Sequence, residues 1–240
     1  MSRENAVADT AAKAEEARRL LCEIAPLIND LKIILDKRSH VALSLLVGSL
    51  EHARALCFVL ANDLEASWFS AMILHRSQID YLVRAAYFAA PASDAQVNAF
   101  YRKGQMPKIK PAIGKSRKMR LTEMADKVET HYKWNDKFTK AIHGHWSPLS
   151  GMSHGGVELL ALYETNGAIG DSTIDYTELV PNIVNVTALG QLALVVAMRM
   201  SPLTEAEISG IIGTVYVKTR EFLQSCLSAP GSSPSEGPPN

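Results

Sequence analysis

Residues 67–90 read SWFSAMILHRSQIDYLVRAAYFAA, and this stretch decides the fold class. Its apolar residues recur at spacings of three and four, the period of an α-helix, and Pro91 ends the pattern. We therefore expect a helix from about Glu65 to Ala90. Because so little of its surface is polar, this helix should be packed among other helices.

Helical periodicity continues on both sides of this stretch. The other expected helices cover residues 9–37, 39–62, 93–101, 121–132, 136–148, 176–200 and 204–227. Ser39, Ser93 and Thr204 are the expected N-caps, and Glu207 completes a capping box with Thr204.

These patterns predict an all-α, single-domain helical bundle of about six to eight helices. One short hairpin or irregular excursion is expected near residues 157–176, with Asn166-Gly167 as a candidate type I′ turn, and strand is expected nowhere else. The expected division is a flexible N-terminus at 1–8, a bundle domain at 9–227 with a basic loop at 102–120, and a disordered tail at 228–240.

Charge and cysteine usage exclude several classes of protein. The 240 residues include 25 basic and 25 acidic side chains, which excludes a globally basic nucleic-acid binder and a globally acidic disordered chain. Cys22, Cys57 and Cys226 are odd in number and far apart, so we expect no disulfide framework and a reducing cytoplasm. The polar, alanine-rich residues 1–19 do not resemble a secretory signal.

No stretch is expected to cross a membrane. The most apolar candidates are residues 41–61, interrupted by Glu51, His52 and Arg54, and residues 184–198. The second is shorter than the ~20 apolar residues that a span needs. Both are better explained as helices buried within protein.

A polar stripe interrupts the apolar helix. Arg76, Asp80 and Arg84 are spaced by four, so they share one face, next to His75. Charges in such surroundings must be paired or solvated, because desolvating one alone costs several kcal/mol. Three interpretations remain: an arginine–aspartate ladder on the surface, a buried ion cluster, or an anion site in which Arg76 or Arg84 holds the ligand and Asp80 orients it.

A second cluster lies at residues 141–156, AIHGHWSPLSGMSHGG. Gly155 and Gly156 would let the backbone approach a partner closely, while His154 and Ser150 turn inward to meet the helix at 65–90 and His145 contributes to the same site. The alternative is that these histidines only cap helix ends and fill a turn. A zinc site would need three or four ligands, and no cysteine lies nearby, so we expect neither metal nor cofactor.

The third feature is the basic loop, in which residues 102–120 carry eight basic and no acidic side chains. Its candidate phosphate-attracting residues are Lys108, Lys110, Lys115, Arg117 and Lys118. The loop could equally be solvated, or neutralise an acidic partner.

Two short motifs lack their structural context. Gly114-Lys115-Ser116 is not a phosphate-binding loop, because Ile109 stands where the first glycine is required. Residues 151–155, GMSHG, match the serine-hydrolase elbow in letters but lack the preceding strand.

The stretches HRSQIDYLVRAAYF (75–88) and WSPLSGMSHGG (146–156), with the order of helices between about residues 15 and 225, resemble bacterial proteins related to the HEPN superfamily. The resemblance implies a helical bundle of the kind found in toxin–antitoxin and phage-defence loci. Catalytic members of that superfamily cleave RNA, usually at a dimer interface, with an arginine four to six intervening residues before a histidine. No histidine of this chain has an arginine at that distance; Lys140 before His145 is the nearest approximation.

Three functions follow as hypotheses. The first is a HEPN-like bundle that binds RNA or a protein partner through Arg76, Asp80, Arg84, the turn at 143–156 and the basic loop. The second is a metal-independent ribonuclease in which Arg76 and His154 meet in space. The third is a structural homodimer formed by the second and sixth long helices.

Overall fold

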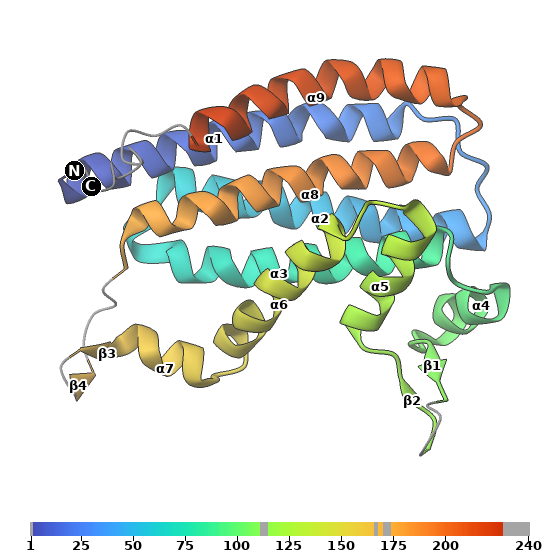
Figure 1. Cartoon of the computed structure of the whole chain (residues 1–240), viewed down its shortest axis with the longest axis horizontal. Helices are drawn as coiled ribbons and strands as arrows, with labels where there is room; N and C mark the ends of the chain where they lie inside the picture. The colour runs from blue at the N-terminus through green and yellow to red at the C-terminus, as the bar shows by residue number, and fades with distance from the viewer. Residues whose placement is uncertain (1, 111–114, 166–167, 170–173, 228–240) are drawn as a thin grey trace, which may run out of the picture.

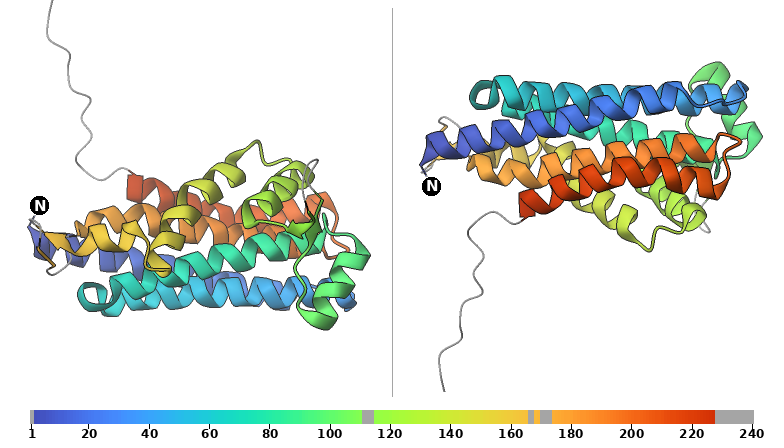
Figure 2. Two further views of the ribbon diagram at one scale, coloured as in Figure 1. Left: turned by 90° about the horizontal axis from the view of Figure 1, so that it is seen from below. Right: turned by 90° about the horizontal axis from the view of Figure 1, so that it is seen from above.

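Five long helices lie side by side along the longest axis of the molecule (Figures 1 and 2). They are α1 (Arg3–Asn29), α2 (Lys37–Asn62), α3 (Leu64–Ala89), α8 (Val180–Arg199) and α9 (Glu205–Leu227). This computed structural model describes residues 2–110, 115–165, 168–169 and 174–227. The predicted all-α, single-domain bundle is confirmed.

Shorter elements flank the long helices. They are α4 (Asp94–Lys103), α5 (Leu121–Tyr132), α6 (Lys137–Ser153), α7 (Val157–Tyr163) and the 3-10 helix η1 (Tyr176–Leu179). Two antiparallel pairs complete the described part: β1 (Lys108–Ile109) with β2 (Arg117–Lys118), and β3 (Glu164–Thr165) with β4 (Ala168–Ile169). In Figure 1, α5 and α6 cross the bundle, while α7 and the β1–β2 hairpin project from its α3 side.

Helix α8 is the centre of the bundle, in contact with α1, α2, α3 and α9. Its apolar sequence is therefore explained by burial on several sides. At Gly190 the backbone of α8 approaches α1 so closely that a Cβ atom would lie 2.2 Å from Cδ2 of Leu21. By length and composition alone, α2 and the segment η1–α8 are also long and apolar enough to cross a membrane, and both pack against other helices here.

The first two helices differ from the prediction at their ends. Helix α1 begins at Arg3 rather than near residue 9, because Ser2 Oγ accepts a hydrogen bond from the Asn5 N–H. It ends at Asn29, so Ile34 falls outside it and is 85% exposed. The predicted cap Ser39 was wrong: Asp36 caps α2, and Ser39 bonds back to it from the third position of the helix.

The other caps are confirmed. Ser93 caps α4, and its hydroxyl accepts from the Gln96 N–H. Thr204 Oγ1 accepts from the Glu207 N–H, and the Glu207 carboxylate accepts from the Thr204 N–H.

Two further expectations were wrong. Helix α6 does not stop at Pro148 but continues to Ser153, because one missing N–H is tolerated in a helix that packs on both α3 and α5. Strand is not confined to residues 157–176: β1 and β2 form in the basic loop, where the backbone of Met119 donates to Pro107.

The predicted excursion at 157–176 contains the short hairpin β3–β4 and, before it, helix α7. The candidate turn Asn166-Gly167 and the predicted tail at 228–240 lie outside the described residues.

Candidate functional site

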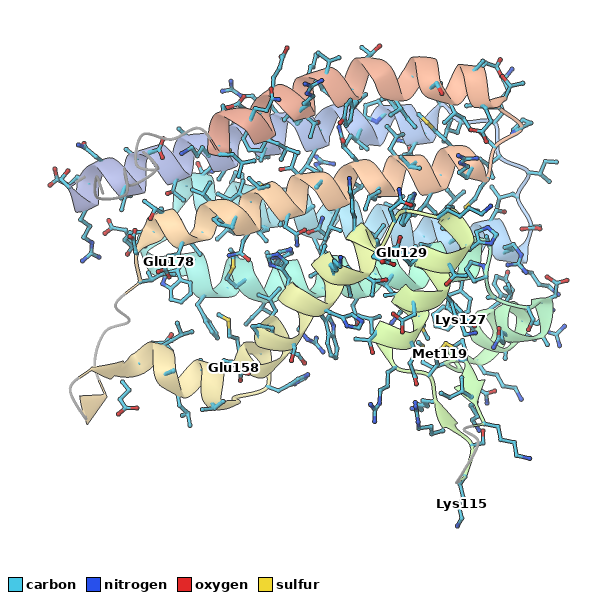
Figure 3. The ribbon with its side chains drawn as sticks, viewed as in Figure 1. Lys115, Met119, Lys127, Glu129, Glu158 and Glu178 are labelled. Carbon is cyan, nitrogen blue, oxygen red and sulfur yellow. The ribbon has the colours of Figure 1, made fainter. Side chains whose placement is uncertain are left out.

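The site is built on α6, and a buried carboxylate holds the start of that helix. Glu129 on α5 accepts hydrogen bonds from the backbone N–H groups of Asp136 and Thr139, each at 3.0 Å. The link from α5 to α6 has three non-glycine residues with positive φ, namely Lys133, Asn135 and Asp136. Such backbone is costly for residues with a Cβ atom. The Glu129 bonds offset that cost and fix the direction in which α6 leaves (Figure 3).

Helix α6 crosses α3, and the crossing brings Arg76 into contact with His154. Nη2 of Arg76 lies 3.1 Å from Nε2 of His154, which is the C-cap of α6. The Arg76 guanidinium carbon also lies 5.8 Å from the centre of the Trp146 ring. The structure thus brings the two clusters together, as the hypothesis of a meeting between Arg76 and His154 requires.

The contact gives one nitrogen of His154 the role of acceptor. A guanidinium group only donates hydrogen bonds, so Nε2 of His154 is the acceptor in this pair. Nε of Arg76 and Nε1 of Trp146 are buried and have no acceptor among the described residues. Two donors without acceptors beside an arginine with no ion pair in the described part favour an anion as the missing partner.

The other members of the polar stripe pair with each other. Arg84 Nη2 lies 2.7 Å from Oδ2 of Asp80, one helical turn away. This is the arginine–aspartate ladder that the sequence left as one interpretation. Arg76 is therefore the arginine of the stripe that is left for a ligand.

His145 faces a different part of α3 from His154. Its ring centre lies 5.8 Å from that of His75, and the Asn185 amide nitrogen lies 3.2 Å from Nε2 of His75. Burial lowers the pKa of His75 to about 3; His145 acts in the same direction, and the hydrogen bond of Asn182 opposes both. Burial also lowers the pKa of His145, again against Asn182. Both imidazoles are thus held neutral.

Asn182 and Asn185 were not among the predicted site residues. Both residues lie on α8 and reach the histidines of α3 and α6. The available signal was the pair of asparagines at 182 and 185 in a mostly apolar helix.

A cavity of about 220 Å³ lies between α3, α6 and the junction of η1 with α8. Trp68 and Met72 of α3 and Leu149 of α6 form apolar walls, while His145 and Asn182 contribute polar groups. This cavity and the Arg76–His154 pair share α6 as a common wall.

The glycines after α6 serve the chain's own turn. Gly155 has φ 72°, a left-handed conformation that suits glycine, and the Gly156 N–H donates to the Gly151 carbonyl at 2.7 Å. The Ser150 carbonyl accepts from the His154 N–H, so this turn sets the place of the imidazole. The close backbone approach expected at Gly156 is thus to Gly151 of the same chain.

The basic loop is partly neutralised. Arg117 makes two bonds to the carboxylate of Glu123, at 2.5 and 2.8 Å. Lys108 and Lys118 are cross-strand partners, and both are exposed. Like charges that face each other repel, so this pair favours an anion between or beside them. Lys110 and Lys115 are exposed as well, and Lys115 lies at the tip of the hairpin (Figure 3).

The remaining histidine of the cluster lies apart. His143 is exposed, and its Nε2 is 3.8 Å from a carboxylate oxygen of Asp126. Across the described residues, no group of three histidine, cysteine, aspartate or glutamate side chains converges as a metal site would require.

Comparison with known proteins adds a family. The chain matches the model of a family of unknown function (DUF6988) over residues 46–211, a range that contains Arg76, Trp146 and His154. No curated protein and no solved structure matches the chain. Since the matched range covers more than half of the sequence, the chain belongs to the DUF6988 family.

Proposed function

We propose that the protein binds single-stranded RNA and holds a phosphate group at the Arg76–His154 pair. The 3.1 Å contact between these residues carries the proposal, because it places a guanidinium group without a carboxylate partner beside an imidazole. Phosphate oxygens accept hydrogen bonds from guanidinium and indole N–H groups, and both kinds of donor lack an acceptor here.

A single strand fits this surface better than a duplex. Proteins that read single-stranded RNA stack unpaired bases on aromatic rings and on the planes of arginine side chains. Arg76 and Trp146 offer such planes next to the phosphate site. The lysines of the β1–β2 hairpin add attraction for the backbone without reading sequence. The resemblance of residues 75–88 and 146–156 to the HEPN superfamily supports the choice of RNA.

Binding can be tested with a fluorescently labelled single-stranded RNA. Replacement Arg76→Gln removes a charge-assisted contact worth roughly 1.5–3 kcal/mol, so affinity should fall about tenfold or more. Arg54→Gln, an exposed arginine of α2, is the matched control for loss of one positive charge. Equal losses in the two variants would reduce the proposal to nonspecific charge attraction.

Cleavage is a second candidate, favoured by the nearness of the His154 imidazole to the Arg76 guanidinium. When a phosphate takes the place of Nε2 as the partner of Arg76, the freed imidazole nitrogen can take the proton of a ribose 2′-hydroxyl as the 2′ oxygen attacks the neighbouring phosphorus. The bond from phosphorus to the 5′ oxygen then breaks, and the imidazolium returns the proton to that leaving oxygen. Arg76 would stabilise the charge on the phosphorane. The products are a 2′,3′-cyclic phosphate and a free 5′-hydroxyl.

DNA of the same sequence separates the two candidates, because it lacks the 2′-hydroxyl. A ribonuclease would cut the RNA and leave the DNA intact, and His154→Ala would abolish cutting. If the wild type leaves RNA intact at all times while Arg76→Gln weakens its binding, the protein binds RNA without cleaving it.

A further inference from the structure

The cavity beside the Arg76–His154 pair has the features of a binding site for one flat heterocycle. Trp68, Met72 and Leu149 give it apolar walls. Its volume of about 220 Å³ compares with the ~150 Å³ of an engineered cavity that holds benzene. It therefore has room for one base but not for a whole nucleotide.

Two acceptors are among the polar groups of the cavity. Pro148 has no N–H, so the carbonyl of Gly144, four residues earlier, lacks its usual helical donor, and both residues line the cavity. Glu178, at the end of the cavity near η1, is the charged side chain among the described lining residues (Figure 3). A carboxylate and a carbonyl repel phosphate and accept hydrogen bonds from an amino group.

Asn182 and His145 complete the polar edge. The side-chain amide of Asn182 donates to the Glu178 carbonyl at 3.4 Å and is also hydrogen-bonded to His145. His145 is half-buried and neutral, and since Asn182 occupies one of its ring nitrogens, one nitrogen is left for a ligand. Mixed donors and acceptors on one side of an apolar slot match the edge of a nucleobase.

The cavity lies at a suitable distance from the phosphate site. Met72 in its wall precedes Arg76 by four residues, which is roughly 6 Å along α3. On α6, His145 of the cavity is adjacent to Trp146, which lies beside Arg76. A nucleotide whose phosphate contacts Arg76 could thus place its own or a neighbouring base between α3 and α6.

We infer that this cavity binds an RNA base with an exocyclic amino group, adenine or cytosine in preference to uracil. The inference rests on the proposed function, because the RNA supplies the base. The acceptors at Gly144 and Glu178 carry the preference, since uracil presents a carbonyl oxygen where cytosine presents an amino group.

Nucleosides test the cavity separately from the phosphate site, because they carry no phosphate. Binding of adenosine, cytidine and uridine at millimolar concentration would be followed by saturation-transfer NMR. We expect adenosine and cytidine to bind at least about tenfold more tightly than uridine. No binding by any nucleoside, or equal binding of cytidine and uridine, would overturn the inference.

Variants that fill the cavity test the same inference by mutation. Gly144 lines the cavity, and a Cβ atom there would meet no heavy atom within 4 Å, so Gly144→Leu adds a side chain at the cavity wall without a clash. Leu162→Trp fills the same cavity from α7 and guards against a folding defect of the first variant. Both variants should lose nucleoside binding, whereas Arg76→Gln should keep it. Nucleoside binding that survives in two folded, filled variants contradicts the inference.

The two proposals fail in different ways. If RNA binding does not depend on Arg76 while Gly144→Leu abolishes nucleoside binding, the proposed function is wrong and the base site stands. If RNA binding depends on Arg76 but the filled variants bind nucleosides as well as the wild type, the base site is wrong and the proposed function stands.

Discussion

Nη2 of Arg76 and Nε2 of His154 lie 3.1 Å apart, although 78 positions separate the two residues in the chain. An arginine–histidine pair is thus formed by the crossing of α3 and α6 rather than by a short motif. The pair therefore depends on how α6 is held against α3 and α5.

Because His75 stays neutral in the folded chain but takes up a proton in the unfolded chain, the fold should be less stable in mild acid. Its pKa is lowered to about 3 in the folded chain, so the unfolded state binds more protons below the ordinary value near 6.5. This contribution to stability is complete above that value and falls as the pH decreases. Between pH 7 and pH 5 the free energy of unfolding should drop by about 2 kcal/mol from this residue. Urea unfolding at several pH values measures the drop, and His75→Gln should remove most of it.

Replacing Glu129 with glutamine should loosen α6. The amide oxygen of glutamine can replace one carboxylate acceptor but not both, so one backbone N–H at the start of α6 loses its partner. The expected cost is about 1–2 kcal/mol, with weaker RNA binding because His154 is displaced. Glu221→Gln, at an exposed position of α9, is the control. An unchanged denaturation midpoint in Glu129→Gln would contradict the role given to this carboxylate.

Two glycines on neighbouring helices should respond to alanine in opposite directions. At Gly190 the new methyl group would overlap Leu21, and such overpacking typically costs about 1–3 kcal/mol. At Gly213 on α9 a Cβ atom meets nothing within 4 Å, so alanine should stabilise the helix by up to about 1 kcal/mol. Thermal unfolding of the two variants compares them directly. A Gly190→Ala protein as stable as the wild type would mean that α1 and α8 are not in this close contact.

The lysines of the β1–β2 hairpin should set the salt dependence of RNA binding. Removing one phosphate contact with Lys108→Gln should reduce the slope of log affinity against log salt by about 0.7 for a single strand. Arg220→Gln removes a positive charge from an exposed position of α9, on the far side of the bundle from the hairpin (Figure 1), and should leave the slope unchanged. The same slope in both variants would exclude the hairpin from the binding surface.

The sequence predicts the bundle well because its signals are local. Apolar periodicity identifies the long helices, and Ser93 and Thr204 act as caps through residues three positions away. The end of α1 was misjudged because Ile34 continues the helical spacing after the helix has stopped, and Asp36 takes the cap that Ser39 was expected to form.

The site was predicted only in part, because its geometry depends on a crossing that no local pattern encodes. The sequence gives both Arg76 and His154 as candidates, yet their contact requires the left-handed turn before α6 and the buried Glu129. The pairing of Arg84 with Asp80 follows from helical spacing and was foreseen as one of three alternatives. The bonds from Arg117 to Glu123 and the cavity at Asn182 involve residues from separate segments and were not anticipated.

The anchorage of α6 through Glu129 has a practical consequence. Helix α6 lies outside the five long helices, so a variant that releases it can keep most of its far-UV circular dichroism and its solubility. Such a protein would look folded by these measurements although the Arg76–His154 contact is lost. Assays on mutants of α5 and α6 therefore need a probe on α6 itself, such as the fluorescence of Trp146. Only with such a probe can a loss of RNA binding be attributed to the removed side chain rather than to the release of α6.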